Sequence, residues 1–306
     1  MNGAALIALD WGTTSLRAYR VAGDGAVIDR MEAPSGILQV PGGDFGGTFD
    51  RLVGPWLAEH PLPVIASGMI GSRQGWREAP YAACPAGAAD LAANLVAVTS
   101  PAGHTVRLVP GVMQSGADGI PDVMRGEETQ IVGCLQATDS PRQVFVLPGT
   151  HSKWAMVEGG RIARFATFMT GEVFAALRKH TILGRLMDGD ADDAEAFRRG
   201  VEQSGRGGGL LRRLFSARTL PLFDRLPGTG VAAYLSGLLI GEEIAEAVTW
   251  AGTPHVAAQR PTIVGAPALA ERYRQALIIL NIESRIAPAD AAAAGVRNIL
   301  AAEIRP

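Results

Sequence analysis

The pattern of apolar and polar positions divides the first half of the chain into strands, helices and turns. Near the N-terminus three apolar runs are separated by short polar breaks, one of them marked by Asp24-Gly25, as in an antiparallel meander. Further on, apolar residues at helical spacing alternate with short apolar runs. The predicted order is three strands, a helix, a strand, a helix and a strand, at residues 4–10, 15–21, 26–31, 45–59, 63–69, 87–98 and 105–112.

The second half repeats this order with a longer helical insertion. Its strands are predicted at 143–148, 153–158, 161–168, 261–265 and 282–287. A helix is predicted to begin at about 171, and the pattern is almost wholly helical from there to about 250. Gly205 to Gly209 interrupts it, and we expect a flexible exposed linker there, with a hinge as the alternative.

One hairpin motif occurs twice in the chain. Residues 9–18 read LDWGTTSLRA and residues 147–156 read LPGTHSKWAM, and the two align without a gap at Gly-Thr-x-Ser. In each copy a third strand follows and ends at Ser35-Gly36 or Thr170-Gly171. We infer an internally duplicated α/β fold of two lobes, each a mixed sheet with flanking helices. The lobes are expected at 1–141 and 142–306, with a last helix free to pack back on the first lobe.

The two Gly-Thr-x-Ser loops are candidates for binding a polyphosphate. Each offers backbone N–H groups and hydroxyls, and two such loops facing each other across a cleft could hold one from both sides. ATP-dependent chemistry is therefore the first hypothesis. The candidate residues are Gly12, Thr13, Thr14 and Ser15 in the first loop and Gly149, Thr150, His151, Ser152 and Lys153 in the second.

Lys153 adds a cation to the second loop. The only lysines are Lys153 and Lys179, and an ammonium in this loop could reach a phosphate as a compact point charge. A surface lysine whose stem covers apolar surface is the alternative. The chain contains no G-x-x-x-x-G-K-[ST] and no clean G-x-G-x-x-G that opens a helix, which argues against a P-loop protein. The paired loops instead resemble the actin-like ATPase superfamily (ribonuclease H-like fold), which includes sugar kinases.

Composition limits the classes of function. The 306 residues are 47% apolar, enough for a core in each of two domains. A net charge of −2 without a basic run argues against nucleic acid and an anionic membrane as partners. Cys84 and Cys134 lie in different halves, which favours a reducing compartment without disulfides. No apolar run approaches the roughly 20 residues that span a bilayer, so we expect a cytoplasmic protein.

Three carboxylates are candidates for the chemistry. Asp10 ends the first strand, where it could hold Mg²⁺ through water beside substrate phosphates. An Asx-type turn, in which Asp10 accepts N–H groups of its own loop, is the alternative. Glu127 and Glu128 follow Gly126 at a predicted helix start, where acidic residues commonly offset the helix dipole. In sugar kinases of the superfamily the catalytic carboxylate opens the helix before the second phosphate loop, which favours Glu127 as the base, with Glu128 as the alternative.

The glycine-rich segment 66–81 is the candidate substrate loop. Ligands bind after the carboxyl ends of strands in α/β sheets, Arg suits a carboxylate, and aromatic rings suit a sugar-like carbon chain. A surface loop with its tryptophan in the interdomain seam is the alternative. The candidate residues are Ser72, Arg73, Trp76, Arg77 and Tyr81.

Two further positions could line the ligand site. Thr170 opens a helix, where Glu172 in the first turn is a plain structural feature, but the matching Ser35-Gly36 suggests a role in the cleft. Gly265-Ala266 follows a predicted strand and would let an adenine ring approach the backbone closely.

Five segments together resemble the 2-dehydro-3-deoxygalactonokinase family: LDWGTTSLRAYR, SGMIGSRQGW, MRGEETQ, LPGTHSKWA and FMTGEVFAALRKHTIL. The resemblance implies ATP- and Mg²⁺-dependent phosphorylation of 2-dehydro-3-deoxy-D-galactonate at its terminal C6 hydroxyl, in galactonate catabolism. We expect a monomer or homodimer with a small sugar acid as its partner. Two alternatives are a phosphohydrolase of the same fold, acting on polyphosphate or a phosphorylated nucleotide, and a non-catalytic ATP- or sugar-binding regulator.

Overall fold

The computed structural model describes residues 3–116, 119–135, 142–189, 192–252 and 260–304. The chain divides into two compact units, of which the first comprises residues 1–141, 157–165 and 290–306 and the second comprises 142–156 and 166–289. The sequence-based boundary at 141 coincides with one of these junctions. The hairpin tip 157–165 was expected in the second lobe but belongs to the first unit. The C-terminal segment 290–306 also belongs to the first unit, as the sequence allowed for the last helix.

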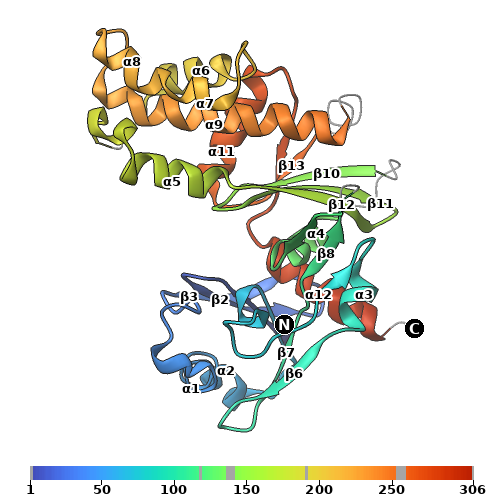
Figure 1. Cartoon of the computed structure of the whole chain (residues 1–306). Coiled ribbons are helices and arrows are strands. Elements are labelled where there is room, and N and C mark those ends of the chain that lie inside the picture. The colour runs from blue at the N-terminus through green and yellow to red at the C-terminus, as the bar shows by residue number, and fades with distance from the viewer. Residues whose placement is uncertain (1–2, 117–118, 136–141, 190–191, 253–259, 305–306) are drawn as a thin grey trace. The chain divides into compact units, whose positions relative to one another are not determined.

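A six-stranded mixed sheet forms the centre of the first unit (Figure 1). Its strands are β1 Ala4–Trp11, β2 Leu16–Ala22, β3 Val27–Ala33, β4 Val64–Ser67, β6 Val96–Thr99 and β7 Thr105–Leu108. The order is β3-β2-β1-β4-β7-β6, with β4 parallel to β1 and β7 and the other neighbours antiparallel. The central strand β1 is buried from Leu6 to Leu9, as expected for a strand covered on both faces.

Three elements of the first unit differ from the sequence-based expectation. The helix expected at 87–98 is α3 Ala88–Ala92 only, because the β-branched residues of β6 pair with β7 instead. The helix expected at 45–59 is divided into α1 Phe45–Leu52 and α2 Gly54–Glu59, since Pro55 cannot donate the N–H that a continuous helix requires.

The third difference is the strand expected at 105–112, which is two strands in two sheets. Its first part is β7, and its end begins β8 Val112–Ser115. A small sheet of order β5-β8-β9 contains β8 together with β5 Ala82–Ala83 and β9 Pro121–Met124. Short 3-10 helices complete the unit, η1 Pro41–Gly43 and η2 Met69–Gly71.

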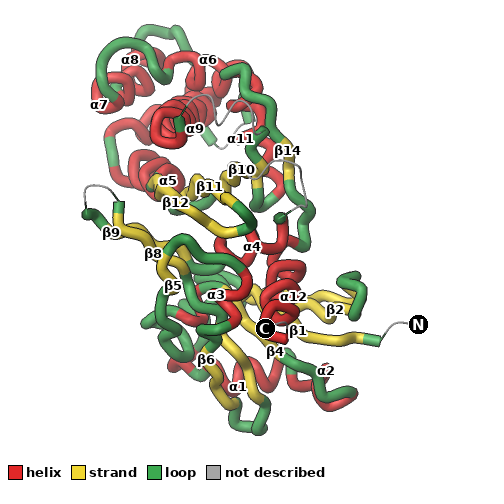
Figure 2. Tube along the Cα trace, turned by 90° about the vertical axis from the view of Figure 1, so that its right-hand side faces the viewer, coloured by secondary structure: helices red, strands yellow, loops and turns green. Residues whose placement is uncertain are grey.

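Two helices far apart in sequence pack closely in the first unit, α4 Glu127–Cys134 and α12 Ala291–Ile304 (Figure 2). Gly133 and Gly295 make this approach possible. A Cβ on Gly133 would lie 1.9 Å from the carbonyl oxygen of Ala291, and one on Gly295 would lie 1.9 Å from that of Thr129. Since α12 also contacts α3 and β1, the last helix completes the first unit.

The second unit contains a five-stranded sheet. Its strands are β10 Arg142–Leu147, β11 Ser152–Glu158, β12 Arg161–Phe168, β13 Thr262–Ile263 and β14 Arg285–Ile286. The order is β12-β11-β10-β13-β14, with β13 parallel to β10 and β14. This order repeats that of the first five strands in the other sheet, as the internal duplication predicts.

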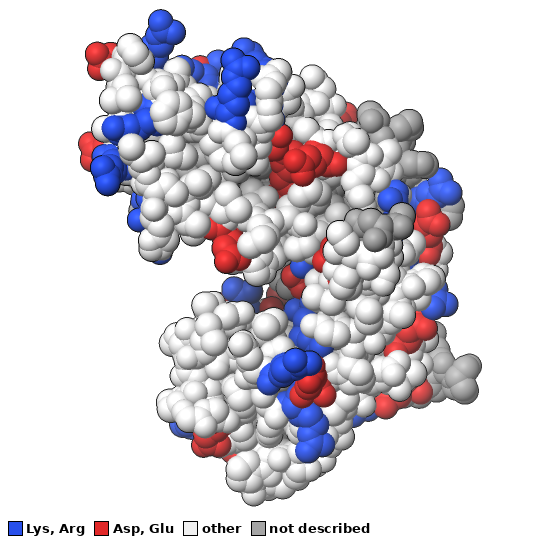
Figure 3. Space-filling model, viewed as in Figure 1, with Lys and Arg blue, Asp and Glu red and all other residues white. Residues whose placement is uncertain are grey.

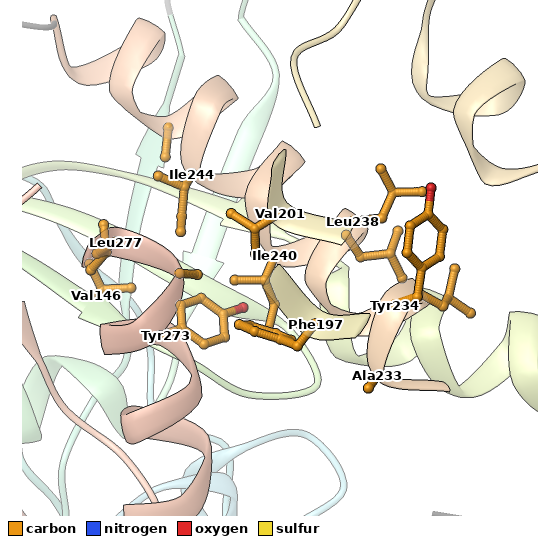
Figure 4. Packing of buried hydrophobic residues seen from close by; sticks show 14 of the residues in the cluster. Val146, Phe197, Val201, Ala233, Tyr234, Leu238, Ile240, Ile244, Tyr273 and Leu277 are labelled. Carbon is orange, nitrogen blue, oxygen red and sulfur yellow. The ribbon is translucent and has the colours of Figure 1, made fainter. Parts of the chain in front are cut away.

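The helical insertion predicted after residue 171 forms most of the second unit. Its helices are α5 Thr170–His180, η3 Ile182–Leu186, α6 Ala194–Gln203, α7 Leu210–Leu214, α8 Ser216–Leu222 and α9 Gly228–Ala251, and α11 Pro267–Ile279 follows β13. The long helix α9 is buried along most of its length. Figure 4 shows Tyr234, Leu238 and Ile240 of α9 in the same cluster as Phe197 of α6 and Tyr273 of α11.

The glycine-rich connection between α6 and α7 is exposed but anchored. The buried guanidinium of Arg213 donates hydrogen bonds to the carbonyl oxygens of Arg206 and Gly208 and also pairs with Glu242. Gly205 to Gly209 is therefore a loop held by a buried arginine rather than a free linker.

Charged side chains of both signs are interspersed over the face of the molecule in Figure 3, with wide uncharged areas between them. Among the described residues, none of the helices combines the length and the apolar character that a bilayer span requires.

Candidate functional site

The first Gly-Thr-x-Ser loop is supported by the residue pair that ends the third strand of its hairpin. A Cβ on Gly36 would lie 2.3 Å from the backbone nitrogen of Thr14, so only glycine fits there. Trp11 Nε1 donates to the carbonyl of Ser35 at 2.8 Å, and Ile37 N donates to that of Gly12 at 3.0 Å. The loop backbone is thereby fixed.

The second loop is supported in the same way within its own unit. A Cβ on Gly171 would lie 2.4 Å from the carbonyl oxygen of Gly149, and Glu172 N donates to the carbonyl of Thr150 at 3.0 Å. The repeated [Ser/Thr]-Gly pair therefore has a structural role in both copies, because its glycine packs directly against the backbone of the loop.

The two loops present different side chains. Thr13 and Thr14 are exposed, while Gly12 N donates to the carbonyl of Ser15 at 2.9 Å and closes the turn. In the second loop, His151 Nε2 lies 2.5 Å from Glu172 Oε2. The exposed threonines leave the first loop with hydroxyls able to meet a ligand.

Asp10 lies at the carboxyl end of β1, between Arg17 of β2 and Ser67 of β4 in register. Its side chain is 17% exposed, and its contact with Arg17 is long, 4.0 Å from Oδ2 to Nη1. Burial raises the pKa of Asp10, while Arg17 opposes that shift. Among the residues that the structure describes, none donates a hydrogen bond to this carboxylate, so the Asx-type turn is not observed.

Two glycines connect Asp10 to the start of α4. Gly68 follows β4 with φ +94°, and a Cβ on it would lie 3.5 Å from Asp10 Oδ1 and 2.8 Å from the carbonyl oxygen of Trp11. Gly126 has φ +108°, and a Cβ on it would lie 3.1 Å from Gly68 Cα. Both need a backbone conformation that favours glycine. The end of β1, the end of β4 and the N-terminus of α4 therefore meet.

Glu127 and Glu128 differ sharply in environment. Glu127 is partly exposed, and its Oε2 accepts a hydrogen bond from Arg125 N at 3.0 Å. Glu128 is fully buried and accepts hydrogen bonds from Gly126 N at 2.7 Å and from the Thr129 hydroxyl at 2.9 Å. Burial, and to a lesser degree the neighbouring Glu127, raise the pKa of Glu128 to about 8. Of the two, Glu127 is the one that a substrate could reach.

Trp76 of the candidate substrate loop is partly buried in the core of the first unit. Its ring lies 6.5 Å from that of Trp11 and 6.0 Å from that of Phe49, centroid to centroid. These contacts all lie within the first unit. Trp76 anchors the loop under the end of β1.

The other candidate substrate residues lie at different depths. The Arg73 side chain is 86% exposed and pairs with Glu78, and Arg77 is exposed and donates to a backbone carbonyl. Tyr81 is 37% exposed, with one face covered by a guanidinium. The Ser72 hydroxyl is buried without a partner in the described part of the chain. These positions leave Ser72 and Tyr81 as the stronger candidates.

Lys153 is not on the surface. It is 5% exposed on β11, and its Nζ donates to the Thr167 hydroxyl of β12 at 2.8 Å. The alternative of a surface lysine is therefore wrong. The side chain supplies a positive charge below the second loop, within its own unit.

Ser152 is likewise turned inward. It is fully buried, and its hydroxyl donates to Glu243 Oε1 of α9 at 2.7 Å. This hydroxyl is occupied inside the unit, so any contact of Ser152 with a ligand falls to its backbone.

Gly265 and Ala266 lie close to the second loop. Both are exposed, and a Cβ on Gly265 would lie 3.5 Å from the carbonyl oxygen of Pro148, which precedes Gly149. Ala266 is the N-cap of α11 and supplies no side-chain cap. The turn expected to meet adenosine therefore adjoins the turn expected to meet phosphate.

Two charged residues near these sites were missed in the sequence analysis. Arg125 is 8% exposed, donates to the carbonyl of Ala79 at 2.8 Å and lies 4.4 Å over the Tyr81 ring. It directly precedes Gly126, so its position next to the candidate base was a usable signal. Glu243 is 3% exposed but lies in a GEEIAEA segment that looks like an ordinary helix surface.

The fold is that of the actin-like ATPases and sugar kinases. At 12% identity and a TM-score of 0.52, the chain is similar to the activator of 2-hydroxyisocaproyl-CoA dehydratase from Clostridium difficile with bound ADPNP, covering 98% of this chain and 96% of that one. The duplicated strand order and loops of the two units agree with this class.

Closer relatives define the family. The family model described as 2-keto-3-deoxy-galactonokinase matches residues 10–299. The 2-dehydro-3-deoxygalactonokinase of Escherichia coli strain K12 is 33% identical over 297 residues, 97% of each chain. A Sinorhizobium meliloti protein of known crystal structure, assigned to the same activity, is 35% identical with a TM-score of 0.84 over 98% of this chain and 99% of that one. The chain belongs to the 2-keto-3-deoxy-galactonokinase family.

Proposed function

We propose that the protein transfers the γ-phosphoryl group of ATP to the C6 hydroxyl of 2-dehydro-3-deoxy-D-galactonate, in the cytoplasm, as a step of galactonate catabolism. The family supplies the reaction class and the substrate. The observation that carries the proposal to particular residues is the meeting of Gly68 and Gly126, because it brings Asp10 and the start of α4 to one edge of the first sheet.

Glu127 is the proposed general base. Its partly exposed carboxylate would accept the proton of the sugar hydroxyl and orient the oxygen for in-line attack on phosphorus. Glu128 is assigned a structural role, since its carboxyl group is enclosed at the first turn of the same helix.

Asp10 is the proposed residue that holds Mg²⁺ through water. Its carboxylate has free acceptor positions and only a 4.0 Å contact with a cation, which fits an ion that shares one carboxylate with substrate phosphates. In the described part of the chain, no cluster of three or more His, Cys, Asp or Glu side chains is placed to bind a metal. When bound, the ion would offset charge on the phosphates.

The nucleotide is proposed to contact both loops and the adenosine turn. In the first unit the ligands are the Gly12–Ser15 backbone and the Thr13 and Thr14 hydroxyls, and in the second they are the Gly149–Ser152 backbone and the Lys153 ammonium. Gly265 and Ala266 would meet the adenosine, since they lie next to Pro148.

The sugar acid is proposed to bind at the 66–81 loop. Ser72 offers a buried hydroxyl without a partner among the described residues, and Tyr81 offers a partly exposed ring. Arg125 fixes this loop to the start of α4 through its contacts with Ala79 and Tyr81.

Coupled measurement of ATP consumption against a panel of 2-keto-3-deoxy sugar acids tests the proposal. We expect turnover that depends on the sugar acid and is fastest with the galactonate derivative. Phosphate release that is indifferent to the sugar acid would contradict the kinase assignment and favour the phosphohydrolase. A faster reaction with the gluconate epimer would contradict the substrate.

A further inference from the structure

A buried carboxylate connects three segments of the second unit beneath its phosphate loop. Glu243 of α9 is 3% exposed and accepts hydrogen bonds from the Ser152 hydroxyl at 2.7 Å and Trp154 Nε1 at 2.9 Å, both on Oε1. Its Oε2 accepts one from the Tyr273 hydroxyl at 2.5 Å. The Thr170 hydroxyl is a fourth hydrogen-bond partner.

These partners come from the segments assigned to the nucleotide. Ser152 belongs to the second phosphate loop, and Thr170 directly precedes Gly171, the glycine that packs against that loop. Tyr273 lies on α11, which begins directly after Gly265 and Ala266. A single side chain on α9 is thus hydrogen-bonded to the phosphate loop, to the start of α5 at Thr170 and to the helix that follows the adenosine turn.

A buried ionisable group costs stability, and an apolar side chain would suit the rest of the buried α9 surface. Hydrogen bonds from all four neighbours offset that cost and oppose the rise that burial causes in the pKa of Glu243. The first phosphate loop has no such support: within the described residues, Ser15 makes no side-chain hydrogen bond. This set of hydrogen bonds to Glu243, called the tether below, therefore occurs only in the second of the two copies as the structure describes them.

We propose that Glu243 is a positioning residue that sets the second phosphate loop relative to the adenosine turn. Loss of this carboxylate leaves Ser152, Thr170 and Tyr273 without their common acceptor, so the loop and α11 shift independently and the nucleotide is bound less well. The sugar acid, assigned to the first unit, is unaffected. This inference rests on the proposed nucleotide site.

The test compares Glu243→Ala and Glu243→Gln with Ile244→Ala, a change at the neighbouring buried position of the same helix. We expect Glu243→Ala to raise the KM for ATP at least about tenfold, because several buried hydrogen bonds are lost together, with the KM for the sugar acid within about twofold of wild type. Glu243→Gln keeps an acceptor for Ser152 and Trp154 and should recover much of the loss. Ile244→Ala should lower the melting temperature without changing the KM for ATP.

Tyr273→Phe keeps the ring in the core and removes only the hydrogen bond to Oε2, so it tests the tether even where Glu243→Ala fails to fold. We expect a severalfold rise in the KM for ATP and in the dissociation constant of ATP measured by calorimetry. An unchanged ATP affinity in Tyr273→Phe, or an equal rise in Ile244→Ala, would overturn the inference. A wild-type protein that binds no ATP would instead contradict the proposed function.

Discussion

Carboxylates that look alike in the sequence occupy three different environments. Asp10 is mostly buried and receives no hydrogen bond from the residues that the structure describes, Glu127 is partly exposed at a helix start, and Glu128 is enclosed beside it. Sequence reasoning located all three, because a strand end and a helix start are visible as patterns. It could not separate Glu127 from Glu128, since both lie in the same first helical turn and their burial depends on tertiary packing.

Replacing Asp10 with Asn tests the metal role. The amide is almost the same size but has no charge to hold a hydrated Mg²⁺, so we expect turnover to fall by about 10²-fold or more while the fold is retained. Steady-state kinetics across a Mg²⁺ titration and circular dichroism measure both. Asp29→Asn, on exposed β3, is the matched control and should be neutral. Near-wild-type turnover of Asp10→Asn at saturating Mg²⁺ would contradict the assignment.

The identity of the base is tested by two substitutions one residue apart. Glu127→Gln should lower kcat by about 10²–10⁴ while ATP still binds, because general-base catalysis contributes a factor of that size. Glu128→Gln should change kcat only a few-fold near neutral pH, since the raised pKa of Glu128 already keeps its carboxyl group mostly protonated there. Single-turnover assays with both variants decide the order. The reverse order would assign the base to Glu128.

Burial of Glu128 also predicts a pH dependence of stability. Its pKa rises from an ordinary 4.5 to about 8 on folding, so the folded protein binds the additional proton between these values. The stabilising contribution is present below about pH 4.5 and is lost as the pH rises towards 8, by a few kcal/mol at most. Urea unfolding at several pH values should show this slope in the wild type and a flatter one in Glu128→Gln. Equal slopes would mean that the group titrates normally.

At the scale of elements, local patterns were good predictors where the element packs on its own neighbours. The two three-strand meanders and α4 and α5 begin where the sequence indicates. The error at 87–98 arose because the Ala-rich segment has helical propensity, whereas Val96–Thr99 is drawn into the sheet by β7. Likewise the burial of Lys153 and Glu243 could not be predicted, because nothing local shows that another helix or strand covers them.

Close packing of α4 against α12 makes Gly295 a sensitive position. A methyl group there would lie 1.9 Å from the carbonyl oxygen of Thr129, in the helix that carries Glu127. We expect Gly295→Ala to destabilise the protein by about 1–3 kcal/mol or more and to lower kcat through displacement of α4. Gly54→Ala, where nothing lies within 4 Å of the added Cβ, is the matched control and should be neutral or stabilising. Equal melting temperatures for the two variants would refute the close contact.

At the scale of the whole molecule, the duplication was predictable, whereas the composition of the units was predictable only in part. The Gly-Thr-x-Ser motif and the glycines that pack against it, Gly36 and Gly171, are repeated in the sequence. The structure shows the same repetition in the strand order of the two sheets. The assignment of 157–165 and 290–306 to the first unit depends on contacts between segments far apart in the chain, such as Ile162 with Ala86 and Asn298 with Val132, which no local pattern encodes.

Deletion of residues 290–306 should therefore affect the first unit selectively. We expect faster amide hydrogen exchange in β1 and α4, which lose their contacts with α12, and unchanged protection along α9 of the second unit. Mass spectrometry of peptides from each unit measures the difference. The same loss of protection in α9, or no loss in β1, would contradict this division of the chain.

The return of α12 to the first unit has a consequence for biosynthesis. On the ribosome, all of residues 142–289 are made before α12, so β1 and α4 emerge long before the helix that packs against them. The N-terminal unit therefore stays incompletely packed until the whole second unit has been translated. Chaperone dependence during synthesis should accordingly be concentrated in the segment made first.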